Sequence, residues 1–389
     1  MYYICIDIAK FDHCASVVDS QGEVLVEPFY FENNNEGLQV FLSKTQEYSR
    51  YRHVTGLEAT GHYGDNFISF LLDNDYQVGI INPISTNAQR KLKIRKTKND
   101  KKDTFLIAQV LMAKEYTTMT KQKFKMREAK QLTRYHSEIT ETIATYKNRL
   151  QKNIDMVFPE YNTFFKTKYS KIYMAVLKEF GSAYNIANAH LTKLKTVLCQ
   201  KGKGQSTVYD PIALRDLAKK SIGNSNPILA LEMQQLIASI ELFTEQLAQV
   251  DKKIEELAQS SNSPIFSIPG IGIITGMSIL SEIGDIDLFG NSSKIIGFAG
   301  MDPAVYQSGE YQALKTAISK RGSTYLRKSL YQCILSVCNY NPVFQDYYTK
   351  KRNEGKVHRC AQGHCIRKLL RVIYKLLTED IVFNEGRLH

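Results

Sequence analysis

Four carboxylates have the types and positions to form one metal site, although they lie far apart along the chain. Asp7 and Glu58 each end an apolar run that reads as a strand, and Asp100 and Asp103 would share one face at the start of a helix. Carboxylates brought together resist ionisation unless cations lie between them. Their hard oxygen ligands suit Mg²⁺ or Mn²⁺, and a pair of such ions can clamp a phosphodiester. The four acids therefore predict a two-metal site; ordinary surface carboxylates are the alternative.

A run of bases leads directly into the pair that begins at Asp100. Such runs usually form the solvated face of a helix, but bases beside a metal site would hold a phosphate backbone where the ions act. We therefore expect nucleic-acid contacts from Arg90, Lys91, Lys93, Arg95, Lys96 and Lys98.

The second half of the chain adds a glycine turn and a serine. The sequence Ile-Pro-Gly-Ile-Gly at 268–272 resembles a helix-hairpin-helix turn, whose backbone N–H groups meet a DNA phosphate without reading sequence. Ser308 stands beside Gly309 in a polar break between apolar segments, so we expect its hydroxyl to be accessible. A plain turn between helices and a loop serine without a role are the alternatives. Phosphate contacts are predicted for Gly270, Gly272, Lys320, Arg321, Arg327 and Lys328.

Charge is unevenly distributed along the chain. The 389 residues are enough for two or three domains, and their net charge is +12. Residues 1–89 hold 12 acids and 4 bases, a net charge of −8, so the remainder carries +20. An acidic first part beside a basic remainder fits an enzyme that acts on nucleic acid.

The cysteines and the hydropathy of the sequence predict where in the cell the protein is found. The 7 cysteines are scattered without a repeated spacing, which predicts reduced thiols and a cytoplasmic protein. No apolar run approaches the roughly 20 residues of a membrane span, so we expect no membrane partner.

Alternating elements in the first 81 residues would position the acids. Three strands are expected within residues 2–31. The asparagines at 33–35 can cap a helix at 36–48, which is followed by the strand that ends at Glu58, a second helix, and a strand at 76–81. This order predicts an α/β sheet of mixed direction.

Most of the remainder is predicted to be helical. Residues 103–157 read as helix almost throughout, residues 160–225 as irregular, and residues 226–258 as a long helix with an apolar stripe. The long helix would pair with residues 126–157 as an antiparallel or an intermolecular coiled coil.

Two basic amphipathic helices, at about 343–352 and 359–377, are expected near the end of the chain. These elements suggest three parts. They are a catalytic domain at 1–125, a helical coiled-coil region at 126–258 with an insertion at about 160–225, and a mostly α domain with Ser308 at 259–389.

Together these motifs resemble the IS-one-ten family of insertion-sequence transposases. The family is also called DEDD transposases and includes Piv-like DNA invertases and bridge-RNA-guided recombinases. Residues 1–155 resemble its RuvC-like domain, which has an RNase H-like fold, and residues 226–380 resemble its transposase domain. Two departures are Thr104, where many relatives have Ala, and the long segment 160–225. The resemblance rests on the order and spacing of residues 6–10, 57–61, 98–103, 268–272, 308–309 and 318–322.

The resemblance implies a mechanism. Asp7, Glu58, Asp100 and Asp103 match the metal-binding tetrad of the family, which would hold two Mg²⁺ ions. Ser308 matches the nucleophile, which forms a transient 5′-phosphoserine link with DNA. Such a covalent link keeps the bond energy, so strands can be rejoined without ATP.

The resemblance also implies partners. In the family, the site is shared between subunits of a tetramer built from dimers. A noncoding bridge RNA pairs with donor and target DNA, so base pairing rather than side chains reads the sequence. A protein of this kind would work at the nucleoid, in the cytoplasm of a bacterium or an archaeon.

Other functions remain open on the residues alone. A RuvC-like structure-specific endonuclease, such as a junction resolvase, would hydrolyse DNA with the four acids and would not need Ser308. A non-catalytic nucleic-acid-binding protein would not need Asp7. An actin-like sugar kinase or ATPase also begins with a strand that ends in Asp, but the chain has no glycine-rich phosphate loop to support that function.

Overall fold

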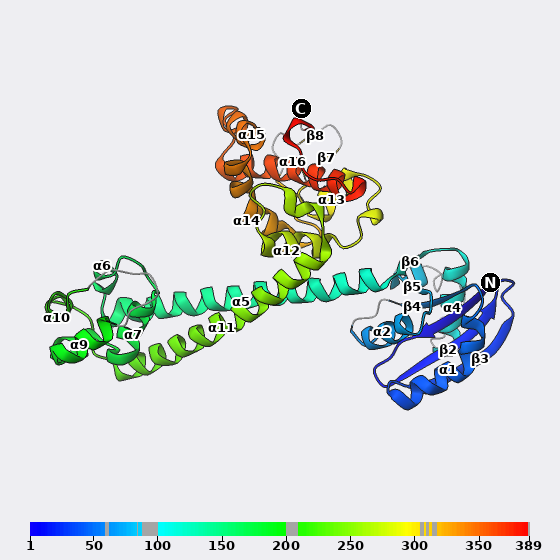
Figure 1. Ribbon diagram of the computed structural model, residues 1–389, viewed down its shortest axis with the longest axis horizontal. Coiled ribbons are helices and arrows are strands. Elements are labelled where there is room, and N and C mark those ends of the chain that lie inside the picture. The colour runs from blue at the N-terminus through cyan, green and yellow to red at the C-terminus, as the bar shows by residue number, and fades with distance from the viewer. Residues whose placement is uncertain are drawn as a thin grey trace. The chain divides into compact units, whose positions relative to one another are not determined.

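The computed structural model describes residues 1–58, 62–83, 85–87, 100–199, 209–303, 307–308, 311–312 and 317–387. The side chains of residues 100–102, 307–308 and 311–312 are outside that description. The chain forms two compact units, Met1–Glu128 and Ala129–His389, which Figure 1 shows from blue to red along the chain. The division into three parts expected from the sequence stays a prediction.

The first unit is built on a six-stranded sheet of mixed direction with the order β3-β2-β1-β4-β5-β6. Strands β1, β4 and β5 are parallel, and each of the other three strands is antiparallel to its neighbours. The expected α/β class of this unit is therefore confirmed. The strands are β1 (Tyr2–Asp7), β2 (Asp12–Asp19), β3 (Val24–Glu32), β4 (His53–Glu58), β5 (Val78–Ile81) and β6 (Tyr116–Met119).

Helices cover both faces of the sheet. One face packs with α1 (Asn35–Ser49) and α2 (Asp65–Asp73), and the opposite face packs with α4 (Asp100–Met112). Helix α1 begins where the asparagine run was expected to cap it, because the side chain of Asn34 accepts a 2.8 Å hydrogen bond from the backbone of Gly37. Residues of β1 alternate between the two faces, since strand side chains point to opposite sides in turn.

Residues 103–157 are helical over most of their length, as predicted, but a short strand that was not predicted interrupts them. Helix α4 ends at Met112, and Lys114 then adopts a left-handed backbone conformation with φ of 58°. Strand β6 follows and pairs with β5 before α5 (Lys121–Val157) begins. Two threonines and a tyrosine within β6 favour a strand, but the helical pattern on both sides obscured that signal.

The prediction of irregular structure over 160–225 was wrong. Short helices fill much of this segment, and each of three begins at a side-chain cap that the sequence displays: Ser170, Ser182 and Asp210. Tyr161 and Tyr173 are fully buried at their centre, with ring centroids 4.7 Å apart. The helices are α6 (Tyr161–Phe164), α7 (Lys171–Phe180), α8 (Ala183–Asn188), α9 (Leu191–Leu198) and α10 (Pro211–Lys219).

In the second unit, α11 (Pro227–Ser261) lies antiparallel to the part of α5 that belongs to this unit. Their contacts run in opposite order along the two helices: His136 is 2.9 Å from Asp251, and Arg149 is 2.7 Å from Glu232. This pair has the antiparallel orientation expected from the apolar stripe, within one chain.

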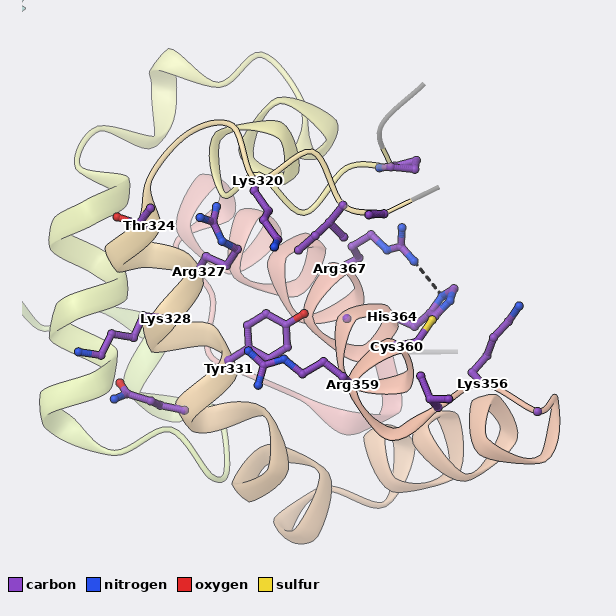
Figure 2. A pocket seen from close by; sticks show the side chains of 17 residues that line it. Lys320, Thr324, Arg327, Lys328, Tyr331, Lys356, Arg359, Cys360, His364 and Arg367 are labelled. Carbon is purple, nitrogen blue, oxygen red and sulfur yellow. Dashed lines mark hydrogen bonds between the residues drawn. The ribbon is translucent and has the colours of Figure 1, made fainter. Parts of the chain in front are cut away.

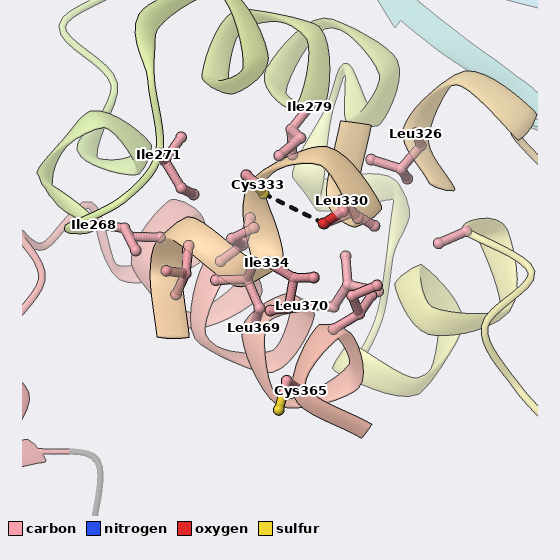
Figure 3. Packing of buried hydrophobic residues seen from close by; sticks show 14 of the residues in the cluster. Ile268, Ile271, Ile279, Leu326, Leu330, Cys333, Ile334, Cys365, Leu369 and Leu370 are labelled. Atoms are coloured by element: carbon pink, nitrogen blue, oxygen red, sulfur yellow. Dashed lines mark hydrogen bonds between the residues drawn. The ribbon is translucent and has the colours of Figure 1, made fainter. Parts of the chain in front are cut away.

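The end of the chain folds into a helical cluster around a shared apolar core (Figure 3). Leu330 and Ile334 of one helix and Leu369 and Leu370 of another are fully buried there. The two basic helices expected near the end of the chain are present. The elements are η1 (Pro264–Ser267), α12 (Ile273–Ile283), η2 (Ile286–Leu288), α13 (Ser292–Phe298), β7 (Gln307–Ser308), β8 (Tyr311–Gln312), α14 (Thr324–Tyr340), α15 (Pro342–Asn353), α16 (His358–Glu379) and η3 (Glu385–Arg387).

In the described part of the chain, each helix is either too short or too polar to cross a bilayer.

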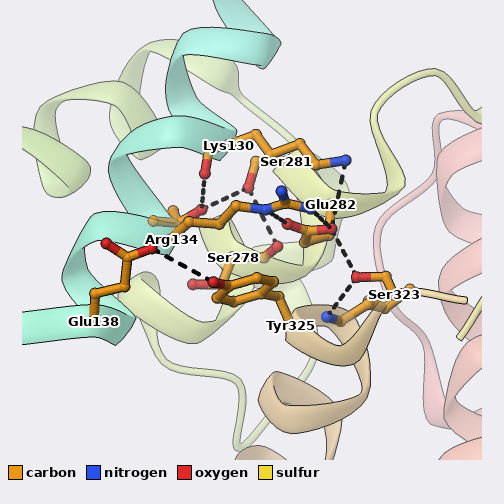
Figure 4. A network of polar contacts seen from close by, with 10 residues as sticks. Lys130, Arg134, Glu138, Ser278, Ser281, Glu282, Ser323 and Tyr325 are labelled. Carbon is orange, nitrogen blue, oxygen red and sulfur yellow. Dashed lines mark hydrogen bonds and ion pairs between the residues drawn. The ribbon is translucent and has the colours of Figure 1, made fainter. Parts of the chain in front are cut away.

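A buried ion cluster joins α5 to this helical cluster (Figure 4). Glu282 on α12 is only 2% exposed, and its carboxylate accepts hydrogen bonds of 2.5 and 3.1 Å from Arg134 on α5. Lys130 lies 3.4 Å from the same carboxylate, and Ser323, which caps α14, donates to it at 2.7 Å. Arg134 also stacks on the ring of Tyr325, with its guanidinium carbon 4.6 Å from the ring centroid. One carboxylate thus connects three helices.

Replacing Glu282 by Ala should lower the free energy of unfolding by about 1.5–3 kcal/mol, because it removes charge-assisted hydrogen bonds from Arg134 and Ser323. Urea denaturation followed by circular dichroism measures this. Glu256→Ala is the matched control, since it removes only an exposed pair with Lys253 and should change stability little. Equal effects of the two substitutions would refute the structural role of Glu282.

The same carboxylate allows a check by pH with a second variant, Glu282→Gln. Burial raises the pKa of Glu282, but the hydrogen bonds from Arg134 and Ser323 and the charge of Lys130 outweigh burial and lower the pKa below its ordinary value of 4.5. Because the folded-state pKa is depressed, the stabilisation is present above pH 4.5 and is lost as pH falls through the folded-state value. The difference in stability between the wild type and Glu282→Gln should therefore shrink at acid pH.

Candidate active site

Asp7 and Glu58 end two neighbouring parallel strands. Strand β1 pairs with β4 so that Ile6 lies opposite Leu57, and the next residue on each strand is the acid. The carboxyl ends of parallel strands meet at one edge of a sheet, so the pairing brings the two acids to adjacent positions at that edge.

Both acids also belong to the face that α4 covers. Cys5, two residues before Asp7, is buried in the cluster that α4 forms with the sheet. Gly56, two residues before Glu58, lies so close to α4 that a Cβ atom there would be 2.5 Å from a methyl carbon of Leu111. Because strand side chains alternate, Asp7 and Glu58 are on this same face.

The other two acids are in the first turn of α4. Asp103 is buried, with 7% of its surface exposed, while the side chain of Asp100 is outside the described residues. Asp100 and Asp103 therefore begin the helix that packs on the face shared by Asp7 and Glu58. The assembly of all four into one tetrad stays a prediction.

The donor set fits a hard divalent cation, because carboxylate oxygens are the ligands that Mg²⁺ and Mn²⁺ prefer. Within the described side chains, which leave out Asp100, no three His, Cys, Asp or Glu groups gather closely enough to hold a metal ion.

Thr86 is a residue of this site that the sequence did not reveal. It is 1% exposed, and its hydroxyl donates a hydrogen bond to the carboxylate of Glu58. The hydroxyl also lies 3.1 Å from the carbonyl oxygen of Pro83, at the end of β5. Thr86 thereby orients Glu58 from the next strand end. A threonine three residues after a proline carries no signal for such a role.

The bases expected to hold a phosphate backbone beside the acids lie outside the described residues. These are Arg90, Lys91, Lys93, Arg95, Lys96 and Lys98.

Ser308 lies in a short hairpin whose stem is well anchored. Strand β7 places Ser308 opposite Tyr311 of β8, and the side chain of Ser308 is outside the described residues. At the base of the hairpin, Pro303 and Ile318 form an antiparallel bridge. Two hydrogen bonds join the neighbouring pair, Ser319 and Asp302. The backbone N–H of Ser319 donates to the backbone carbonyl of Asp302 at 2.8 Å, and the hydroxyl of Ser319 donates to the carboxylate of Asp302 at 2.5 Å.

The return from the hairpin to α14 requires two glycines. Gly322 has φ of +104°, and a Cβ atom there would lie 2.1 Å from the carbonyl oxygen of Phe298. Gly300 has φ of +63°, and its Cβ would lie 2.3 Å from the carbonyl oxygen of Arg321. Only glycine combines this backbone conformation with such close packing. The two glycines hold the chain on both sides of the hairpin together.

The basic residues expected near Ser308 have different surroundings. Lys320, Arg327 and Lys328 line one cavity (Figure 2), while Arg321 is exposed. The guanidinium of Arg327 donates to the carbonyl of Ala299 at 3.0 Å. The ammonium of Lys328 donates to α5, at 2.6 Å to a serine and 2.5 Å to a glutamate. Their contacts with nucleic acid stay predictions.

The glycine turn at 268–272 joins η1 to α12, as a helix-hairpin-helix turn would. Gly270 has φ of +90° and packs so tightly on α14 that its Cβ would lie 2.5 Å from the backbone nitrogen of Val337. Gly272 is exposed and is the N-cap of α12, where no side chain bonds to the first turn of the helix. Gly270 is therefore needed for packing, whereas Gly272 leaves helix N–H groups uncapped for an anion. Their phosphate contacts stay predictions.

Two segments of this chain match families of transposases. Residues 4–159 match a family of DEDD transposases of the IS110 type, described as "Transposase". Residues 262–349 match the family described as "Transposase IS116/IS110/IS902 family".

The similar individual proteins include two from insertion elements and one that inverts a pilin gene. The 44.8 kDa protein of insertion element IS116 from Streptomyces clavuligerus is 21% identical over 98% of this chain and 96% of its own length. The pilin gene-inverting protein of Moraxella bovis is 23% identical over 100% of this chain and 98% of its own. The 42 kDa protein of insertion element IS900 from Mycobacterium paratuberculosis is 27% identical, and this chain covers 47% of its length, about half.

Gly322→Ala should disrupt the stem of the hairpin that contains Ser308. Backbone strain at a positive φ costs about 1–3 kcal/mol, and the overlap with Phe298 adds to it. Gly355→Ala is the matched control, because Gly355 also has a positive φ, +78°, but nothing lies within 4 Å of its Cβ position. Urea denaturation of both variants is the measurement. A loss of stability no larger for Gly322→Ala than for Gly355→Ala would contradict the tight packing.

Proposed function

This chain belongs to the IS110 family of insertion-sequence transposases, and from this premise we propose that it cuts and exchanges DNA strands through a covalent link between Ser308 and a 5′ phosphate. The observation that carries the proposal is the pairing of β1 with β4, which brings Asp7 and Glu58 to neighbouring strand ends on the face covered by α4. The pilin gene-inverting relative supports strand exchange as the outcome.

The first unit has a RuvC-like, RNase H-like fold in this proposal. Support comes from the sheet, in which three parallel strands β1, β4 and β5 continue an antiparallel meander of β1, β2 and β3. Because β1 and β4 are parallel neighbours, the acids at their ends lie at one edge of the sheet. The match of residues 4–159 to the DEDD transposases supports the same assignment.

Each acid of the site has a part in holding divalent cations. Asp7 and Glu58 offer carboxylates from strand ends, Thr86 orients Glu58, and the first turn of α4 supplies Asp100 and Asp103. Two bound Mg²⁺ ions, or Mn²⁺ ions, would polarise the phosphate and stabilise the leaving oxygen.

Ser308 is the nucleophile in the proposed reaction. Its Oγ forms a bond to the phosphorus while the bond from phosphorus to the 3′ oxygen breaks, and the serine proton is balanced by the proton that the 3′ oxygen gains. The product is a 5′-phosphoserine and a free 3′ hydroxyl. Attack by the 3′ hydroxyl of another strand reverses these steps and joins the strands without an external energy source. The anchored stem of the hairpin supports this role, because a nucleophile must be held in place.

The proposed partners are donor DNA, target DNA and a noncoding bridge RNA that reads both by base pairing. The charge of the chain supports polyanionic partners, since the residues after 89 carry +20. A homotetramer built from dimers would share the acids of one subunit with the serine of another. Such a protein would act at the nucleoid.

Ser308→Ala should abolish a denaturation-resistant protein–DNA adduct. The wild type is incubated with Mg²⁺, a plasmid that contains the flanks of the element, and the RNA that copurifies, and the adduct is detected on a denaturing gel. Ser260→Ala, an exposed serine of α11, is the control and should form the adduct as the wild type does. The alternative function, a RuvC-like endonuclease that hydrolyses DNA, predicts cutting without an adduct in all three proteins.

Mg²⁺ should stabilise the protein through the acids. At an ion concentration about ten times the dissociation constant, the expected gain is about 1.4 kcal/mol, seen as a rise in Tm by calorimetry. Asp7→Asn should remove that rise, since it deletes one charged ligand. Glu47→Gln, an exposed acid of α1, should keep it. An equal rise in both variants would rule out Asp7 as a ligand.

A further inference from the structure

A large cavity lies between α14, α16 and the stem of the hairpin that contains Ser308 (Figure 2). Its volume is about 1180 Å³, above the roughly 300–1,000 Å³ of small-molecule pockets. Pro303 and Ile318, which form the bridge in the stem, are among the residues that line the cavity. A ligand in the cavity would therefore contact the stem of the hairpin.

The cavity is strongly basic. None of its described lining residues is acidic, and 6 of them are Lys or Arg. Only Lys328 makes an ion pair among the described residues, to Glu141, so five positive charges have no acidic partner there. Gathered like charges repel one another, and a polyanion removes that repulsion. The six bases are Lys320, Arg327, Lys328, Lys356, Arg359 and Arg367.

The cavity also contains an aromatic ring among these cations. The guanidinium carbon of Arg359 lies 4.3 Å from the ring centroid of Tyr331. Proteins that bind single-stranded nucleic acid combine cations for the backbone with aromatic rings on which bases stack. A base in a duplex is already stacked and paired, so only an unpaired base has a free face for such a site.

A hydrogen bond orients one of the cations that line the cavity. Arg367 donates to Nδ1 of His364 at 3.0 Å, which requires the imidazole to be neutral at that nitrogen. Burial lowers the pKa of His364, and the positive charges of Arg367, Lys351 and Lys356 lower it further, against a smaller opposing effect of Glu354. The neutral imidazole thus orients Arg367 without adding charge of its own.

We propose that this cavity holds a short unpaired stretch of DNA, the one next to the phosphate that Ser308 attacks. The cations bind its backbone, and the pair of Tyr331 and Arg359 contacts an unpaired base. The position beside Ser308 and the choice of DNA rest on the proposed function, whereas binding of an unpaired polyanion by the cavity does not.

A thiol footprint tests the proposal in the full-length protein. Cys360 is exposed and lines the cavity, whereas Cys199, the C-cap of α9, is exposed and does not line it. The other 5 cysteines are buried. Alkylation of each by N-ethylmaleimide is followed by mass spectrometry, with and without a mixed-sequence DNA oligonucleotide. At a DNA concentration about ten times Kd, the oligonucleotide should slow alkylation of Cys360 roughly tenfold and leave Cys199 unchanged. Unchanged alkylation of Cys360 at saturating DNA overturns the proposal.

Charge variants test the same surface by binding. Arg359→Glu and Lys356→Glu alter exposed side chains, so the fold should tolerate them. Each should remove the protection of Cys360 and reduce the slope of log Kd against log salt by roughly 0.7 per lost phosphate contact. Lys375→Glu is the matched control, with the same change of charge at an exposed position of α16 outside the cavity. Equal binding by all three variants overturns the proposal.

Three nucleic-acid probes distinguish the possible ligands of the cavity. Single-stranded DNA should protect Cys360 more than the same sequence as a duplex. Stronger protection by duplex DNA, or by single-stranded RNA of the same sequence, overturns the proposal. The Ser308→Ala protein should keep the protection. Protection by DNA in a wild type that forms no adduct would refute the serine mechanism and leave the DNA-binding cavity intact.

Discussion

The parallel pairing of β1 with β4 is the constraint on which the rest of the first unit depends. A shift of the pairing by one residue would move Asp7 away from Glu58 and would also reverse the faces of one strand, because side chains alternate with a period of two. The register is maintained by apolar packing on both faces, with α1 and α2 on one side and α4 on the other. Burial of these faces therefore determines where the acids lie.

In the second unit, a buried cluster of polar groups positions the helices. Glu282 is buried among cations of α5 and the cap of α14, and breaking such a cluster leaves uncompensated charge inside the protein. Ser323, one of its partners, follows directly on Gly322, where the chain returns from the hairpin of Ser308. The ion cluster and the packed glycine thus fix the segment from which the serine hairpin emerges.

Local patterns predicted much of the architecture. The strands that end at Asp7 and Glu58, the cap at Asn34 and the long helix α11 were all found from apolar periodicity and capping residues, which act between near neighbours in sequence. Strand β6 was missed because only four residues pair with β5 between two helices. The helices α6 to α10 were missed because each is short, and their stability comes from the buried tyrosines that they share.

By itself, the sequence determined the chemistry that the protein has available: acids at the ends of apolar runs, a serine in a polar break, glycines at the turns and a basic second part. The tertiary structure alone decided which of these groups meet. Arg134 finds Glu282 across 148 residues, Thr86 reaches Glu58 from the next strand end, and α14 and α16 close a basic cavity. The physical reason is that such contacts depend on the register and packing of whole elements, and neither is encoded in any short stretch of residues.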